Sequence, residues 1–197
     1  MLIFYGLGNN EPKYLKTKHN CGRIIVENIA QLLKLQFQDT SFGCKLAKGV
    51  VNGEEIWLIY SKGYMNLSGD PLSSLVRYHK LNKNRYKLIV LQDDSDQIEL
   101  CSKMVAGGRS AGHKGIDSII NHKSSVDVEA LWKLKIGIRP EFNKQKSETF
   151  VLSGCSQREL EWYQELSDKI ITNILSFQKQ NLPTLQNIFN QKPKSGI

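Results

Sequence analysis

The amino-acid sequence predicts an α/β protein: a single domain with a twisted mixed β-sheet flanked by helices. Apolar runs of strand length alternate along the chain with segments whose apolar residues recur at helical spacing, which is the pattern of that fold class. With 197 residues, of which 40% are hydrophobic, the chain is long enough for one sizeable core. We expect residues 1–180 to form this domain and residues 181–197 to be a polar, mobile C-terminal tail.

The first half of the chain supplies strands, a hairpin and helices. Residues 2–7 are apolar and end in Gly-Leu-Gly, which is typical of a strand that enters a tight turn. A hairpin is expected around Asn52-Gly53, the strongest short turn signal, with strands at 44–51 and 55–60. The helices predicted from apolar spacing lie at residues 20–35 and 72–78.

The second half continues this alternation. Residues 87–91, KLIVL, form a continuous apolar run typical of a central buried strand. A short helix is expected at residues 116–121, and residues 132–138 alternate in polarity like a strand. Ser156-Gln-Arg-Glu159 is a capping box, the signature of a helix N-terminus, and the apolar residues after it predict a long amphipathic helix that reaches Phe177.

Composition limits the class of function. A formal net charge of +8 and an isoelectric point near 9.3 favour RNA or DNA as a partner over a membrane surface, although many basic surfaces bind nothing. No stretch approaches the roughly 18 apolar residues of a membrane span. The four cysteines are scattered without a C-x-x-C pair, which is typical of reduced thiols in an intracellular protein and argues against a zinc or disulfide framework.

Polar residues follow three of the predicted strands. Asn9, Asn66 and Asp93 each come after a strand, and ligands in open α/β sheets gather outside the carboxyl ends of strands. The three side chains therefore predict a site at that edge of the sheet. Taken alone, the acidic residues Asp93, Asp94 and Asp96 are more typical of a turn, with a divalent metal site as the alternative.

The glycine-rich segment from Gly107 to Gly115 carries Arg109, His113 and Lys114. Its glycine spacing approaches that of a P-loop, but His-Lys stands where Lys-Ser/Thr is required, which argues against a nucleoside triphosphate site. Bare backbone amides and cations are suited to receive a phosphate. The alternative interpretation is a plain glycine turn.

Three motifs together resemble the bacterial-type peptidyl-tRNA hydrolase family. They are GLGN…Y…TKHN…G over residues 6–22, YMNLSG over 64–69, and DD-S-D…GG…GH-G over 93–115, followed by KLKIGIRP over 133–140. Their order and spacing match over about residues 2–155. The family cleaves the ester that joins a peptide to the terminal ribose of tRNA, without a metal or an organic cofactor. The resemblance therefore implies peptidyl-tRNA as the substrate, no cofactor and no bound metal.

The resemblance also implies a role for each catalytic residue. His19 matches a general base that activates water, and an imidazole suits this task because its pKa of about 6.5 lies near the operating pH. Asp93 matches the carboxylate that orients this imidazole and stabilises its protonated form. Asn9 and Asn66 match amides that position substrate and water and donate to the developing oxyanion.

Further positions are implied to contact substrate. Tyr14 and Met65 match positions in the substrate channel, where an aromatic ring and an adaptable thioether pack against the terminal nucleotide or the peptide. His113 matches the loop that flanks this channel. The resemblance also implies electrostatic, salt-sensitive binding of the tRNA. The residues concerned are Lys103, Arg109, His113, Lys114 and Lys135.

Several of these positions depart from the family pattern. Lys114 stands where the family has an asparagine, and an ammonium does not reproduce an amide's paired donor and acceptor, although it suits an RNA phosphate. Gln92 replaces the histidine before the aspartate, which we expect to alter only hydrogen bonds around the site. Of two basic residues before the loop, Lys103 remains and Val105 replaces the second, while Lys135 replaces an arginine that clamps tRNA phosphate.

Two classes of function follow. The first is an active peptidyl-tRNA hydrolase, favoured because His19 and Asp93 are both retained. The second is an RNA-binding homologue that kept the fold and lost turnover, motivated by Lys114 and Val105. A metal-dependent phosphoesterase is a distant third. We expect an intracellular monomer in the cytoplasm or the mitochondrion that does not bind a membrane.

Overall fold

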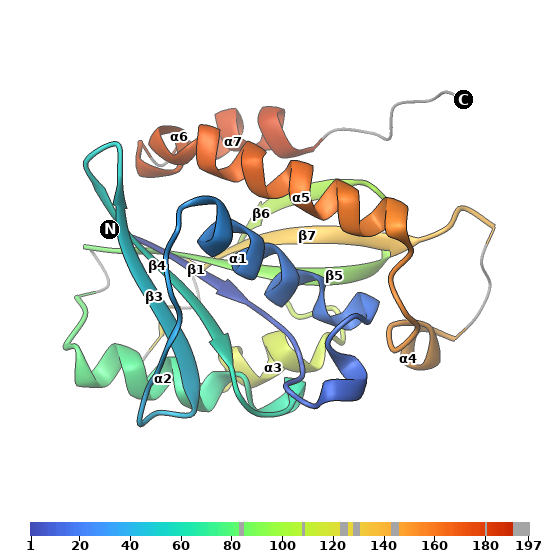
Figure 1. Ribbon diagram of the computed structural model, residues 1–197, viewed down its shortest axis with the longest axis horizontal. Helices are drawn as coiled ribbons and strands as arrows, with labels where there is room; N and C mark the ends of the chain where they lie inside the picture. The colour runs from blue at the N-terminus through green and yellow to red at the C-terminus, as the bar shows by residue number, and fades with distance from the viewer. Residues whose placement is uncertain are drawn as a thin grey trace.

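A computed structural model describes residues 1–82, 85–107, 109–122, 126–127, 131–142, 146–179 and 181–190. Across these ranges seven strands form one sheet in the order β2-β3-β4-β1-β5-β7-β6 (Figure 1). The strands are β1 (Leu2–Gly6), β2 (Gln38–Asp39), β3 (Cys44–Val51), β4 (Glu54–Ser61), β5 (Lys87–Ile98), β6 (Ser102–Ala106) and β7 (Trp132–Arg139).

Helices fill the connections between the strands. The α-helices are α1 (Cys21–Leu32), α2 (Gly69–Tyr78), α3 (Lys114–Ile120), α4 (Ser147–Phe150), α5 (Gln157–Thr172), α6 (Ile174–Gln178) and α7 (Leu182–Phe189). Three short 3₁₀ turns are η1 (Pro12–Tyr14), η2 (Lys18–Asn20) and η3 (Met65–Leu67). The predicted α/β domain with a mixed sheet is confirmed.

The centre of the sheet is parallel. Strand β1 lies between β4 and β5 and is parallel to both, and β7 is parallel to β5. The predicted hairpin joins β3 and β4 through Asn52 and Gly53, whose positive φ angles of 52° and 78° fit a two-residue turn. Because β4, β1, β5 and β7 run in one direction, their carboxyl ends meet at one edge.

Alternating residues of β1 supply both faces of the core. Leu2 and Phe4 belong to one buried cluster with α1, α5, α6 and α7, whereas Ile3 and Tyr5 belong to a second cluster with α2 and α3. Figure 1 shows these two groups of helices on opposite sides of the sheet. Such double coverage explains why the central strands read as continuous apolar runs.

Strand β5 is longer than the predicted run of residues 87–91. Its pairing with β1 ends at Leu91, but β7 continues the pairing, so that Asp93 stands opposite Ile136. The acidic run that is typical of a turn is therefore part of a strand. Asp93 consequently projects beyond the end of β1, at the edge where the carboxyl ends meet.

The end of the chain also differs from the sequence prediction. Instead of a mobile tail from residue 181, the structure has helix α7, whose Leu185 and Phe189 are fully buried. Ser102 Oγ of β6 donates to the Phe189 carbonyl at 2.7 Å, and the Met104 amide donates to Asn190 Oδ1 at 2.7 Å. The segment is polar overall, so its few apolar residues did not indicate a packed helix. Residues 191–197 lie outside the described residues.

The capping box at Ser156 is confirmed, but the helix after it is not continuous to Phe177. Ser156 accepts a hydrogen bond from the Glu159 amide, and the Glu159 carboxylate accepts one from the Ser156 amide in return. Helix α5 ends at Thr172, and α6 begins after Asn173. Among the described helices, none is long and apolar enough to cross a membrane.

Candidate active site

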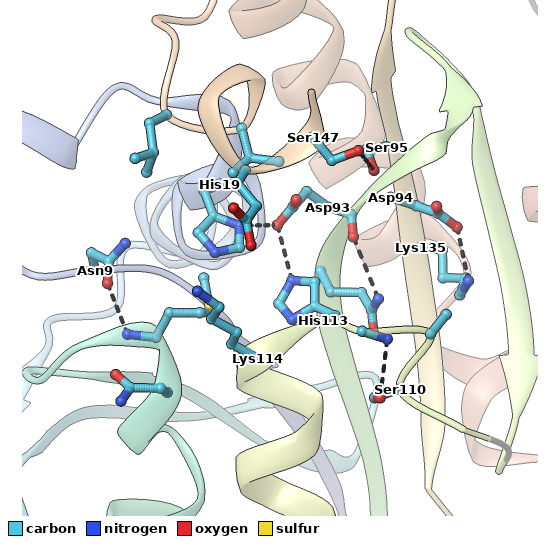
Figure 2. A pocket seen from close by; sticks show the side chains of 18 of the residues that line it. Asn9, His19, Asp93, Asp94, Ser95, Ser110, His113, Lys114, Lys135 and Ser147 are labelled. Carbon is cyan, nitrogen blue, oxygen red and sulfur yellow. Dashed lines mark hydrogen bonds and ion pairs between the residues drawn. The ribbon is translucent and has the colours of Figure 1, made fainter. Parts of the chain in front are cut away.

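A pocket of about 670 Å³ opens at the edge where the parallel strands end. Its walls come from the segments after β1 and β4, from β5 and β7, from the glycine-rich segment and from α4 (Figure 2). Of the residues that the sequence nominates, nine line this pocket: Asn9, Tyr14, His19, Met65, Asn66, Asp93, His113, Lys114 and Lys135. Lys103 and Arg109 do not line it and are exposed elsewhere.

His19 is held in place by the segment that precedes α5. Its backbone amide donates to the Val151 carbonyl at 2.8 Å, and the neighbouring Lys18 amide donates to the Ser153 carbonyl at 3.0 Å. Lys18 also forms a buried ion pair with Glu159, so that two charged side chains connect η2 to α5. This attachment fixes the backbone from which the imidazole enters the pocket.

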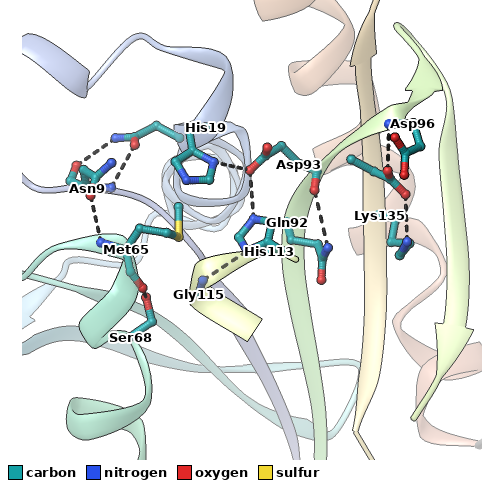
Figure 3. Close-up of polar contacts among 12 residues, drawn as sticks. Asn9, His19, Met65, Ser68, Gln92, Asp93, Asp96, His113, Gly115 and Lys135 are labelled. Atoms are coloured by element: carbon teal, nitrogen blue, oxygen red, sulfur yellow. Dashed lines mark hydrogen bonds and ion pairs between the residues drawn. The ribbon is translucent and has the colours of Figure 1, made fainter. Parts of the chain in front are cut away.

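Asn9 is held by a reciprocal pair of hydrogen bonds with Asn20. The Asn9 amide donates to Asn20 Oδ1, and Asn20 Nδ2 donates to the Asn9 carbonyl, both at 2.8 Å. Asn9 Oδ1 accepts from the Met65 amide at 2.8 Å, which joins the ends of β1 and β4 (Figure 3). The Asn9 Nδ2 group is thereby left to donate into the pocket.

Asp93 is the meeting point of two imidazoles. His19 Nδ1 lies 2.7 Å and His113 Nε2 lies 3.0 Å from the same carboxylate oxygen, Asp93 Oδ1 (Figure 3). The side chains of Asp93, His113 and His19 are 3%, 7% and 13% exposed, so water screens these contacts little. Burial raises the pKa of Asp93, but the two imidazoles outweigh burial and hold this pKa well below its ordinary value.

The tautomer of His113 follows from its second contact. The Gly115 backbone amide donates to His113 Nδ1 at 3.2 Å, where the imidazole caps the N-terminus of α3. In the neutral ring the proton therefore resides on Nε2, which donates to Asp93. His19, Asp93 and His113 place three potential ligand atoms within 4.8 Å of one another. However, His113 turns an N–H toward the others, so this set fits a metal ion poorly.

The acidic run does not form a metal site either. Asp94 forms an ion pair with Lys135 at 2.8 Å and accepts a hydrogen bond from Gln97 Nε2 at 2.8 Å. Burial raises the pKa of Asp94, but these contacts with Lys135 and Gln97 keep it below its ordinary value. Lys135 therefore lines the pocket as one half of an ion pair, whereas the resemblance implied a cation for tRNA.

Two further residues distinguish this site. Gln92 is buried, donates to the Asp93 carbonyl at 3.4 Å, and leaves its Oε1 without a hydrogen-bond partner among the described residues. Lys114 begins α3, is exposed, and extends into the pocket toward Asn9 and His19 (Figure 2). Within the described ranges, no ion pair or hydrogen bond holds the Lys114 ammonium.

Sequence reasoning missed two residues that support the site. Asn20 is fully buried and holds Asn9, and its place beside His19 in the TKHN motif was the only available signal. Lys133 is 2% exposed and donates to the Arg109 carbonyl at 3.1 Å, which fastens the glycine-rich segment to β7. Burial lowers the pKa of Lys133, and nothing in the alternating WKLKIGI pattern marked this lysine as buried.

The α/β fold carries a histidine–aspartate pair in a pocket at the strand ends, an arrangement that suits the class of hydrolases. The family model described as peptidyl-tRNA hydrolase matches residues 3–196, and the chain belongs to this family. No metal or organic group is required to complete the hydrogen bonds among His19, Asp93 and His113.

Individual relatives agree with this assignment. A peptidyl-tRNA hydrolase of Desulfitobacterium hafniense is 29% identical over 97% of this chain and 100% of its own length. That of Bartonella bacilliformis is 31% identical over 88% of this chain and 87% of its own length. Among solved structures, peptidyl-tRNA hydrolase from Acinetobacter baumannii covers 96% of this chain and 93% of its own, with a TM-score of 0.81 at 23% identity. A peptidyl-tRNA hydrolase in complex with N-propanol has a TM-score of 0.82 at 24% identity, over 98% of this chain and 95% of its own, which supports the fold.

Proposed function

We propose that this chain hydrolyses the ester between a peptide and the terminal ribose of tRNA, with His19 as the general base. One observation carries the proposal: His19 Nδ1 is engaged by Asp93 at 2.7 Å, in a pocket at the strand ends. This contact places the ring proton on Nδ1 and leaves the Nε2 lone pair for a water molecule. Family membership supports the choice of substrate.

The reaction follows from these positions. Water gives a proton to His19 Nε2 while its oxygen bonds to the ester carbonyl carbon, and Asp93 stabilises the imidazolium that results. Donors from Asn9 Nδ2 and the Asn66 side chain, both at the pocket, receive the negative charge on the carbonyl oxygen. The bond to the ribose oxygen then breaks, and the imidazolium returns its proton to that oxygen. The products are the free peptide and tRNA.

Binding of the two ends of the substrate involves different surfaces. Tyr14 and the buried Met65 line the pocket and offer apolar contacts to the peptide or the terminal nucleotide. The net charge of +8 supports electrostatic attraction of the tRNA. Of the residues that the resemblance assigns to tRNA, Lys103, Arg109 and Lys114 are exposed, and Lys114 lines the pocket without an ion pair in the described chain. His113 and Lys135 are instead engaged by Asp93 and Asp94.

The comparisons give no support to an RNA-binding homologue without turnover, because the relatives are named as hydrolases. The expectation that the chain works as a monomer stays a prediction. The compartment, cytoplasm or mitochondrion, stays a prediction.

The proposal is tested by the release of N-blocked aminoacyl groups from tRNA. Wild type, His19→Ala and His79→Ala are compared with and without EDTA; His79 is a half-buried histidine outside the pocket and serves as the matched control. We expect turnover in wild type and His79→Ala that survives EDTA, and loss of turnover in His19→Ala. Wild type that binds tRNA but releases nothing above His19→Ala would refute the proposal.

A further inference from the structure

We infer that His113 is a positioning residue, which acts through Asp93 to orient the imidazole of His19. This role rests on the proposed function and differs from the substrate contact that the resemblance implies for the glycine-rich segment. The three residues come from η2, from β5 and from the position just before α3, so that Asp93 is held from both sides of the pocket.

The first step is that a single oxygen atom of the Asp93 carboxylate is contacted by both imidazoles. His19 Nδ1 and His113 Nε2 approach Asp93 Oδ1 at 2.7 and 3.0 Å. A carboxylate that is only 3% exposed needs donors to replace water, and two donors on one oxygen fix the rotation of the carboxylate. Without His113, the His19 contact alone would hold that oxygen.

The second step is that His113 remains a donor in one fixed orientation. Its Nδ1 accepts from the Gly115 amide, and a ring nitrogen accepts only when it carries no proton. The backbone is close here because residue 115 is glycine: a Cβ would meet Met65 Sδ at 2.7 Å and Leu7 Cδ1 at 2.9 Å. The neutral imidazole therefore spans the helix cap on one side and Asp93 on the other.

The third step concerns charge: the negative charge of Asp93 stabilises the positive charge that forms on His19, and His113 does not compete for it. A neutral His113 adds a hydrogen bond but no second positive charge, so the imidazolium formed on His19 is the cation that Asp93 stabilises. Asp93 also acts on the buried thiol of Cys21, whose pKa is raised by burial and then by Asp93. The thiol therefore stays uncharged and does not compete.

Two substitutions separate the two hydrogen bonds of His113. In His113→Asn the amide oxygen takes the place of Nδ1 and keeps the bond from Gly115, while the donor to Asp93 is lost. In His113→Gln the longer side chain returns an N–H to the place of Nε2 and restores the donor to Asp93. The pair is therefore a matched test of the bond to Asp93.

We expect His113→Asn to lower kcat by about 10- to 100-fold, the equivalent of one hydrogen bond to a charged group, with KM and the melting temperature close to wild type. His113→Gln is expected to recover most of that loss. Equal losses in both variants, or a raised KM with an unchanged kcat, would overturn the inference and favour a direct contact with substrate.

A second readout does not require turnover. Carbon-13 NMR of the Asp93 carboxyl group reports its titration, and we expect the pKa to rise by at least about 1 pH unit in His113→Asn and to stay near wild type in His113→Gln. Unchanged titration in His113→Asn would overturn the inference even if the enzyme is active. If wild type is inactive, the proposed function is refuted, but the NMR titration of Asp93 still tests whether His113 positions its carboxylate.

Discussion

Lys18 and Glu159 form an ion pair that is almost fully buried, with side chains 8% and 3% exposed. Glu159 also closes the capping box of α5, and Lys18 precedes His19 in the chain. One charged pair therefore connects the start of a long helix to the residue proposed as the general base.

This pair makes Glu159→Gln a sensitive substitution. Glutamine still closes the capping box, but it leaves the Lys18 ammonium buried without a counter-charge, which costs about 3–5 kcal/mol of unfolding free energy. Urea unfolding measures the change. Adding Lys18→Met to Glu159→Gln is expected to recover much of the stability, and a double variant no more stable than Glu159→Gln would contradict the role assigned to the pair.

Helix α7 gives a second prediction. Leu185 is fully buried, and Leu185→Ala is expected to lower the unfolding free energy by about 2–5 kcal/mol, as for other large-to-small changes in a core. Leu175→Ala, at a position 44% exposed, is the matched control and is expected to change little. Equal effects of the two substitutions in thermal unfolding would show that α7 does not pack on the domain.

The lowered pKa of Asp93 predicts how stability depends on pH. The folded-state pKa lies well below the ordinary value of 3.8, so the contribution of Asp93 is complete above about pH 4 and is lost as the pH falls below the unfolded-state pKa. The difference in unfolding free energy between wild type and Asp93→Asn is therefore expected to shrink between pH 6 and pH 2. Asp168→Asn, at an exposed position in α5, serves as control; a constant difference for Asp93→Asn would contradict the prediction.

Lys114 provides a prediction about substrate. Its exposed ammonium, which extends into the pocket, is expected to contact a phosphate, so Lys114→Met should raise KM about threefold to fivefold and leave kcat nearly unchanged. The slope of log KM against log salt concentration should fall by about 1. Lys179→Met, also at an exposed position, should change neither quantity, and an unaltered salt slope in Lys114→Met would rule out the phosphate contact.

The sequence was informative where chemistry is concentrated in short motifs. Asn9, His19 and Asp93 could be nominated because they lie in recognisable motifs, and the structure brings all three to one pocket. The partner of Asp93 on the other side could not be foreseen, because no sequence pattern relates Asp93 to the ring orientation of His113. That orientation depends on the Gly115 amide at the start of α3.

Other misses have physical causes of the same kind. Lys135 looks like a free cation in the sequence, yet the extension of β5 along β7 brings Asp94 within 2.8 Å of it. Strand β6 and helix α7 stabilise each other through contacts between residues about 85 positions apart, such as Ser102 with Phe189, which are 87 apart. The local composition of residues 181–197 does not reveal contacts with distant residues, so this segment was predicted to be a polar, mobile tail.

The central claim is that His19 activates the water that cleaves peptidyl-tRNA. The most direct measurement is kcat/KM for release of an N-blocked aminoacyl group from tRNA by wild type and by His19→Ala, with folding of the variant verified by its melting temperature. The account predicts a fall of about 10²- to 10⁴-fold, the range for loss of a general base. A folded His19→Ala that retains kcat/KM within threefold of wild type would contradict it.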